Sequence, residues 1–366
     1  MLAPTLQQMG RTFVREEGRG RKLIYFGGCD YFRMASHPEV LRALHDGADR
    51  YGLNVAASRL TTGNHQLFMA LEQALVKFFG VEGAALFSTG YATNLAFTQS
   101  FTGHFTHALL DARLHGSPRD AAELLHCPVK TFRHRDPEDL RRQIKACGRA
   151  ARPLVLTDGM FSHDGSLAPL AEYLAVLPRA GMLLVDDAHG AGTLGRTGKG
   201  TPEVCGVRDE RLVQTISLSK AVGVYGGALL GSAKIIRTVQ ERSHIFIGNT
   251  PMPLPLAAAA LKSLQLLRRD PTLRARLSAN TTRLKTALRA AGFPVADSAA
   301  PLVALTPRDA RHAARTKSAL RRAGIYPPLI RYLGGPPDGY FRFALSSEHT
   351  PAQLDRLATV LIGSLK

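Results

Sequence analysis

The segment PLVLTDGMFSHDGSLAPLAEYLAVLPRAGMLLVDDAHG (153–190) decides the fold. It begins with an apolar run, PLVLTDG (153–159), continues with a helix-like stretch, LAPLAEYLAVL (167–177), and ends with a second apolar run, MLLVDDAH (182–189). Short continuous apolar runs are typical of strands that are buried on both faces, and a helix between two of them indicates a parallel crossover unit.

The same alternation continues on both sides of this segment, from about residue 84 to residue 232. The further strand-like and helix-like runs are AALFS (84–88), GYATNLAFTQSF (90–101), HALLDA (107–112), SPRDAAELLH (117–126) and RLVQTISLS (211–219). The pattern therefore predicts an α/β domain with a mainly parallel sheet that helices cover on both faces.

The pattern changes after Pro255, where long helices rich in Ala, Leu and Arg begin. Two strand-like runs, PLVALTP (301–307) and YFRFALS (340–346), lie among them. This combination is typical of a smaller α+β domain. The predicted division is an N-terminal segment at 1–40, a large domain at 41–255 and a small C-terminal domain at 256–366.

Composition is that of a globular protein, since 366 residues with 45% hydrophobic side chains can build two cores. Residues 1–22 carry charges where a signal peptide needs an apolar run, and we therefore expect a cytoplasmic protein without a membrane span. The four cysteines lack CxxC spacing, which indicates neither disulfides nor a zinc site. A net charge of +18 favours anionic partners, but much of it lies in the helix-like segments 270–292 and 308–324, where solvated faces explain it.

Polar residues follow four of the predicted strands, at the carboxyl ends where open α/β sheets bind ligands. They are Ser88 and Gly90, Asp111 and His115, Asp186 and His189, and Ser217, Ser219 and Lys220. Pyridoxal 5'-phosphate (PLP) needs such a set: an amine for its aldehyde, a carboxylate for its ring nitrogen, and hydroxyl and N–H donors for its phosphate. We therefore predict that PLP is attached to Lys220 as a Schiff base.

Eight motifs in order strengthen this interpretation. They are CDYFRMASHPEV (29–40), SRLTTGNHQLFMALEQALVKFFG (58–80), FSTGYATN (87–94), DARLHGS (111–117), TDGMFSHDGSLAPL (157–170), LLVDDAHGAGTLGRTGKG (183–200), SLSKAVGVYGGALLGS (217–232) and FRFALSSEHT (341–350). Through them the chain resembles the α-oxoamine synthases, a PLP-dependent family of the aspartate-aminotransferase fold (fold type I). The family condenses an amino acid with an acyl-CoA.

The resemblance implies a role for each matching residue. The implied cofactor-binding residues are Ser88, Gly90, Tyr91, His115, Ser162, Asp186, His189, Ser217, Ser219, Lys220 and Thr250. Among these, Lys220, His115 and Asp186 are the implied catalytic residues, with His115 stacked on the ring and Asp186 paired with its nitrogen. Arg342 is expected to hold the substrate carboxylate. Thr250 belongs to the partner subunit's site in the family, which implies a homodimer with shared active sites.

The implied reaction starts with an amino acid that loses its α-proton to Lys220 and attacks an acyl thioester, and it ends with loss of carbon dioxide to give an aminoketone. Three substrate pairs stay open: L-alanine with a pimeloyl thioester, which we favour, glycine with an acetyl thioester, and serine with a long-chain acyl thioester. The acyl carrier is left open between coenzyme A and acyl carrier protein.

The chain departs from the family pattern at four positions. Ala56 and Ala57 stand in place of glycines before the SRL motif, where we expect them to narrow the substrate pocket and restrict the backbone to ordinary dihedral angles. Arg33 stands where the first motif usually has glycine, and Ser217 replaces a threonine. The substrate is therefore less certain than the reaction type.

Other motif matches are weaker. Gly190, Gly192 and Gly195 have dinucleotide-binding spacing, but a loop-like stretch follows and no acidic residue ends the next strand. Ser217 and Lys220 match SxxK without an SDN or KTG partner, and GRTGKGT (195–201) lacks the spacing of a P-loop. His104 and His107 have no third metal ligand nearby.

Two non-enzymatic alternatives remain, a catalytically silent subunit of the same fold and a basic nucleic-acid-binding relative. Retention of the four implied active-site residues argues against the first, and no nucleic-acid-binding signature supports the second. Those four residues are Lys220, Asp186, His115 and Arg342.

Overall fold

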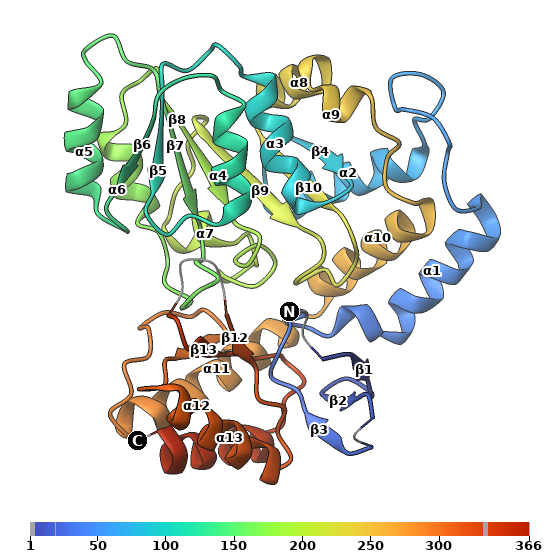
Figure 1. Cartoon of the computed structure of the whole chain (residues 1–366). Helices are drawn as coiled ribbons and strands as arrows, with labels where there is room; N and C mark the ends of the chain where they lie inside the picture. The colour runs from blue at the N-terminus through green and yellow to red at the C-terminus, as the bar shows by residue number, and fades with distance from the viewer. Residues whose placement is uncertain (1–3, 19, 332–335, 366) are drawn as a thin grey trace. The chain divides into compact units, whose positions relative to one another are not determined.

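The computed structural model describes residues 4–18, 20–331 and 336–365, which form two compact units (Figure 1). The first unit comprises the chain up to Ser36, Ser162–Ser166 and the chain from Pro271 onward, and the second comprises His37–Phe161 and Leu167–Asp270. The domain boundaries at residues 40 and 255 stay predictions.

A seven-stranded sheet forms the centre of the second unit. Its order is β4 (Gly83–Phe87), β10 (Gly227–Gly231), β9 (Leu212–Ser217), β8 (Met182–Asp186), β7 (Pro153–Asp158), β5 (His107–Asp111) and β6 (Val129–Phe132). Strand β10 is antiparallel to both of its neighbours, whereas the pairs from β9 to β6 are parallel. The predicted mainly parallel sheet is confirmed.

Alternation along the buried strands sends side chains to both faces of this sheet. Leu154 and Leu156 of β7 join one apolar core, and Val155 between them joins another. Helices α3 (Gly90–Ser100), α4 (Gly116–Glu123), α8 (Ala233–Arg242) and α9 (His244–Ile247) contribute to the first core, and α5 (Pro137–Ala146) and α6 (Leu170–Val176) to the second. Both faces are therefore covered, as the uninterrupted apolar strands predict.

The remaining helices of the second unit are α1 (Pro38–Tyr51), α2 (Gln66–Phe79), the short α7 (Thr201–Val204) and α10 (Leu254–Arg269). Helices α1 and α10 approach closely at Gly47, where an added Cβ would lie 2.9 Å from the Ala258 Cβ and 3.1 Å from the Pro255 Cα. Glycine at this position therefore permits the helix contact.

The first unit contains two antiparallel three-stranded sheets. One consists of β1 (Leu6–Gln8), β2 (Phe13–Glu16) and β3 (Lys22–Ile24), and the other of β11 (Leu302–Leu305), β13 (Tyr340–Ala344) and β12 (Leu329–Ile330). The helical elements are η1 (Met34–Ser36), α11 (Thr272–Ala290), α12 (Ala310–Arg322) and α13 (Pro351–Leu365). Across the described ranges of the whole chain, no helix combines the length and apolar character that crossing a membrane requires.

The structure corrects the expectation for Ala56 and shows the same backbone conformation at Arg33. Ala56 does not keep ordinary dihedral angles, because its φ is +50°, and Arg33 likewise has a φ of +54°. The Ala56 N–H donates to Asn54 Oδ1 at 2.7 Å, and Asp30 accepts the N–H of Met34 at 2.9 Å in the turn that holds Arg33. The local hydrogen bonds thus retain a glycine-like backbone despite the added side chains.

Candidate active site

Lys220 lies in the turn of residues 218–226 that connects β9 to β10. The strands pair directly, with Gly227 opposite Ser217, and the turn is closed by hydrogen bonds of 2.9 Å from Leu218 N to Gly226 O and 3.0 Å from Gly223 N to Lys220 O. The backbone of this half-buried lysine is therefore held at the end of the sheet rather than on a long loop.

Asp186 ends the neighbouring strand, β8, and its carboxylate is oriented by two donors. Asn94 Nδ2 donates to Oδ2 at 2.9 Å, and the Ala188 N–H donates to Oδ1 at 3.1 Å. Asn94 is itself fixed, because the Thr215 hydroxyl donates to its Oδ1 at 2.8 Å. Asn94 was not among the predicted site residues, and an asparagine inside a predicted helix gives no signal of such a role.

Helix α3 begins at Gly90, beside the end of β9. An added Cβ on Gly90 would lie 3.0 Å from the Ser217 Cβ, and an added Cβ on Gly227 would lie 2.6 Å from Gly90 N. The Thr89 hydroxyl accepts the Ala92 N–H at 3.0 Å, which caps the helix. The first amides and the positive end of the helix dipole thus adjoin the Ser217 hydroxyl, an arrangement that suits a phosphate group.

His115 lies at the start of α4, next to the end of β7. The Nδ1 atom of the His115 ring accepts the backbone N–H of Ser117 at 3.2 Å. The backbone N–H of His115 donates to Asp158 Oδ1 at 3.2 Å. Asp158 pairs in register with Asp186, and burial followed by the nearby Asp186 charge raises the pKa of Asp158 well above its usual range. Asp158 also ends a predicted strand, so the reasoning that found Asp186 could have found it.

Three of the other predicted residues of the second unit, Ser88, His189 and Ser219, also follow strands of the central sheet. Ser88 follows β4, His189 lies half-buried in the turn after β8, and Tyr91 directs its hydroxyl to Asp120. Ser217 Oγ accepts the N–H of the exposed Ser219 at 3.2 Å. Thr250 is exposed in the segment before α10.

Together, the second unit brings an amine, an oriented carboxylate and a phosphate cradle to the ends of β9, β8 and β4, with β10 between β9 and β4. This donor set matches the three parts of PLP: the aldehyde, the pyridine nitrogen and the phosphate. The residues present therefore fit this cofactor, although the individual roles stay predictions.

Ser162 and Arg342 both belong to the first unit, where they contact each other. Arg342, on β13, donates from Nη1 to the Ser162 carbonyl oxygen at 3.2 Å. The segment that contains Ser162 is also held at Gly165, whose carbonyl oxygen accepts the Ser298 hydroxyl at 2.6 Å. The roles of Ser162 and Arg342 toward cofactor and substrate stay predictions.

Lys285 of α11 supports this segment from the interior. Its side chain is buried, and Nζ donates to the Ser298 carbonyl oxygen at 2.9 Å and to its hydroxyl at 3.3 Å. Burial lowers the pKa of Lys285 from 10.5 to about 8, and the neighbouring Arg289 charge acts in the same direction. The charged form of Lys285 is therefore less stable in the folded protein than in the unfolded chain.

The charged Lys285 lowers the free energy of unfolding by its full amount below pH 8, and this effect disappears as the pH rises toward 10.5. We expect the free energy of unfolding of wild type, relative to Lys285→Met, to increase by about 3 kcal/mol over that interval. Urea-induced unfolding at several pH values measures this difference. A Lys317→Met variant, altered on an exposed part of α12, serves as control and should show no such change relative to wild type.

This chain is similar to known proteins over most of its length. The sequence profile of the aminotransferase class I and II family matches residues 21–361. The 8-amino-7-oxononanoate synthase of Thioalkalivibrio sulfidiphilus is 35% identical over 98% of this chain and 92% of its own. That of Pseudomonas paraeruginosa is 38% identical over 93% of this chain and 86% of its own.

Solved structures of serine palmitoyltransferases are also similar to this chain over most of its length. Serine palmitoyltransferase from S. paucimobilis, with a bound PLP–myriocin aldimine, superposes with a TM-score of 0.92 and 29% identity. The alignment covers 99% of this chain and 92% of that one. Serine palmitoyltransferase from Sphingomonas wittichii gives a TM-score of 0.90 with 30% identity over 97% of this chain and 89% of its own.

Proposed function

Because the chain belongs to the aminotransferase class I and II family, within its α-oxoamine synthase branch, we propose that it joins L-alanine to a pimeloyl thioester with release of carbon dioxide. This is the reaction of 8-amino-7-oxononanoate synthase in biotin synthesis. The observation that carries the proposal is the close placement of Lys220, the Asp186 carboxylate and the α3 N-terminus at the ends of β9, β8 and β4. The cofactor is PLP, which supplies the electron sink that makes the amino-acid α-proton acidic.

Each residue contributes a definable step. The Lys220 amine would hold the cofactor covalently, and its Nζ would accept the α-proton of the amino acid. Asp186, aligned by Asn94, keeps a proton on the ring nitrogen. The His115 ring covers one face of the cofactor, and Arg342 binds the substrate carboxylate with two parallel hydrogen bonds.

Substrate choice rests on the relatives. Two 8-amino-7-oxononanoate synthases at 35% and 38% identity support alanine and a pimeloyl thioester. A second candidate, serine with a long-chain acyl thioester, is supported by the TM-score of 0.92 to serine palmitoyltransferase. Coenzyme A and acyl carrier protein are both retained as acyl carriers.

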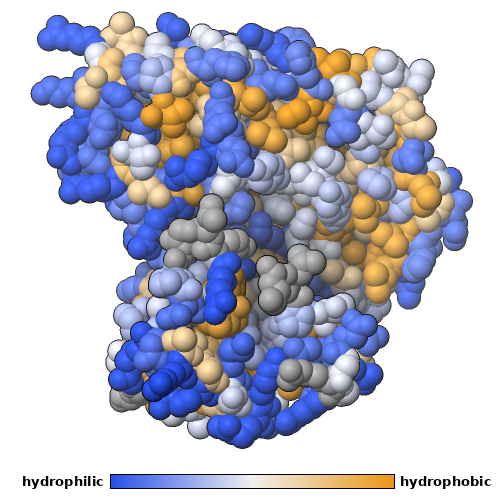
Figure 2. Space-filling model, in the orientation of Figure 1, coloured by the Kyte–Doolittle hydropathy of each residue, from blue (hydrophilic) through white to orange (hydrophobic). Residues whose placement is uncertain are grey.

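A homodimer with shared sites is also part of the proposal. Figure 2 shows apolar side chains gathered on the surface over helices α1 and α10 of the second unit. Large apolar residues exposed in this unit include Leu53 at 71% and Leu60 at 55%. Patches of this kind commonly mark protein interfaces, and the exposed Thr250 is available to a partner's site. Location in the cytoplasm stays a prediction of the sequence.

The function is tested with purified protein and PLP. We expect a visible absorbance band that borohydride removes and that L-alanine alters. Release of thiol and carbon dioxide is then measured for alanine, glycine and serine with pimeloyl, acetyl and palmitoyl thioesters, each on coenzyme A, and with pimeloyl-acyl carrier protein. Activity with serine and palmitoyl-CoA alone would favour the second candidate, and absence of the band would contradict the enzyme proposal.

Arg342→Lys tests the carboxylate clamp. A lysine retains the positive charge but not the planar fork, so we expect the KM for the amino acid to rise by about 10- to 100-fold. The KM for the acyl thioester should change little. Steady-state kinetics with each substrate varied in turn measure both values, and an equal rise in the two would contradict a specific role in carboxylate binding.

A further inference from the structure

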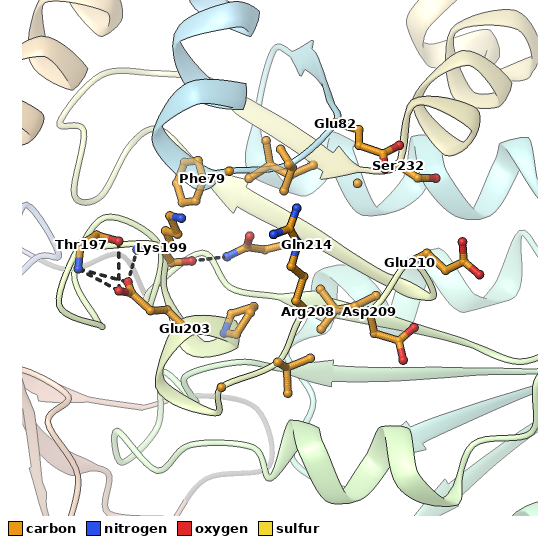
Figure 3. A pocket seen from close by; sticks show the side chains of 18 of the residues that line it. Phe79, Glu82, Thr197, Lys199, Glu203, Arg208, Asp209, Glu210, Gln214 and Ser232 are labelled. Carbon is orange, nitrogen blue, oxygen red and sulfur yellow. Dashed lines mark hydrogen bonds between the residues drawn. The ribbon is translucent and has the colours of Figure 1, made fainter.

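A cavity of about 750 Å³ lies at the end of the central sheet away from Lys220 (Figure 3). Its walls include Leu212 at the start of β9, Gly231 at the end of β10 and Glu82 just before β4. The groups predicted to bind PLP stand at the opposite ends of these strands. Cavities of roughly 300–1,000 Å³ are of the size that binds small molecules.

Three cationic residues, Arg196, Lys199 and Arg208, line this cavity. Figure 3 shows the Arg208 guanidinium and the Lys199 ammonium directed into the same space, beside Phe79 and Gln214. Among the residues that the structure describes, neither cationic group forms a hydrogen bond or an ion pair. An anion that enters the cavity would therefore meet two cationic donors without a protein acceptor, the exposed Arg208 and the half-buried Lys199.

Two of the carboxylates that line the cavity already have strong donors. Glu203 accepts the N–H groups of Thr197 at 3.0 Å and Lys199 at 2.9 Å. Burial acts to raise the pKa of Glu203, but these amides outweigh it and lower the pKa, so the carboxylate stays charged and occupied. Asp209 forms an ion pair of 2.6 Å with Arg211. The other lining carboxylates, Glu82 and Glu210, are exposed.

The rest of the wall is largely apolar, with Phe79, Leu212 and Leu230 among its residues. We propose that the cavity binds a small amphipathic anion. Its carboxylate or phosphate head lies between Arg208 and Lys199, and its hydrocarbon part packs against Phe79 and the half-buried Leu212 and Val207. Burial of the hydrocarbon adds affinity beyond that of the charged head.

The cavity is connected to the strand that carries the predicted PLP carboxylate. Gln214 Nε2 donates to the Lys199 carbonyl oxygen at 3.0 Å and to Asp187 Oδ2 at 2.8 Å. Asp187 directly follows Asp186 and is fully buried. The Lys199 backbone and the Asp187 carboxylate thus share one donor, the Gln214 side chain.

Isothermal titration of the PLP-loaded protein with sodium octanoate, sodium phosphate and 1-octanol tests the site. We expect saturable binding of octanoate, with at least about tenfold weaker binding in Arg208→Gln and in Lys199→Gln. Phosphate should bind more weakly than octanoate because it lacks a hydrocarbon part, and neutral 1-octanol should bind more weakly because it lacks the charge. Arg237→Gln removes an exposed arginine of α8 outside the cavity and should leave octanoate binding unchanged.

Three results would overturn the proposal: equal octanoate affinity in wild type and Arg208→Gln, equal affinity for octanoate and 1-octanol, or equal affinity for phosphate and octanoate. Displacement of octanoate by pimeloyl-CoA would also overturn it, because it would place octanoate in the catalytic site. Circular dichroism confirms that each variant is folded. The binding measurement does not depend on the acyl acceptor, so its failure leaves the proposed reaction intact.

Discussion

Lys220→Ala is expected to lose covalent attachment of PLP and to lower kcat by about 10²–10⁴-fold, the contribution typical of a positioned general base. The variant should retain its fold, because the turn is closed by backbone hydrogen bonds from Leu218 and Gly223 rather than by the lysine side chain. The measurement is mass spectrometry after borohydride reduction, together with the rate of thiol release.

Lys234→Ala is the matched control, since this lysine is exposed on α8. It should keep both the cofactor mass and the activity of wild type. Recovery of the PLP-modified mass in Lys220→Ala would show that a different lysine carries the cofactor, and the assignment of Lys220 would then be wrong.

Asp186→Asn is expected to lower kcat by about 10²–10³-fold, as removal of a preorganised electrostatic partner does in other enzymes. The amide keeps the shape of the carboxylate but has one acceptor atom in place of two. The donors Asn94 Nδ2 and Ala188 N–H therefore compete for it, and the ring nitrogen loses its anionic partner.

PLP should still attach to Lys220 in this variant, with a shifted absorbance spectrum. Stopped-flow spectroscopy separates attachment from turnover. Asp46→Asn, altered on an exposed part of α1, is the control and should behave as wild type. Full activity of Asp186→Asn would exclude the proposed pairing with the ring nitrogen.

Five of the seven strands of the central sheet were predicted, because their largely apolar runs are typical of strands that are buried on both faces. Strand β7, for example, is buried at all six positions of PLVLTD. Strands β6 and β10 were not predicted, and β6 (VKTF) is partly exposed and polar. The strands β1 to β3 were not predicted, because short, partly exposed runs such as LQQ and KLI have no periodicity of their own. Their pairing depends on contacts with distant residues, as in the bridge from Ile24 to Ile325.

Some residues of the candidate site could likewise be predicted from the sequence, and others could not. Residues at the ends of apolar runs, such as Lys220 and Asp186, could be found from position alone. Asn94 could not, since its role arises from the packing of α3 against β9, where Thr215 holds it. The left-handed backbone of Ala56 was also unpredictable, because the hydrogen bond that the Ala56 N–H donates to Asn54 Oδ1 overrides the preference of alanine.

The position of β10 has a consequence for the order in which the chain assembles during synthesis. Strand β4 precedes the phosphate cradle at Gly90, yet its partner in the sheet is β10, where Gly83 pairs with Gly231. A ribosome-bound chain that ends before β10 contains Lys220 but lacks the strand that pairs with both β9 and β4. Contacts so distant in sequence form slowly, and we expect nascent chains to capture PLP only after β10 has left the exit tunnel.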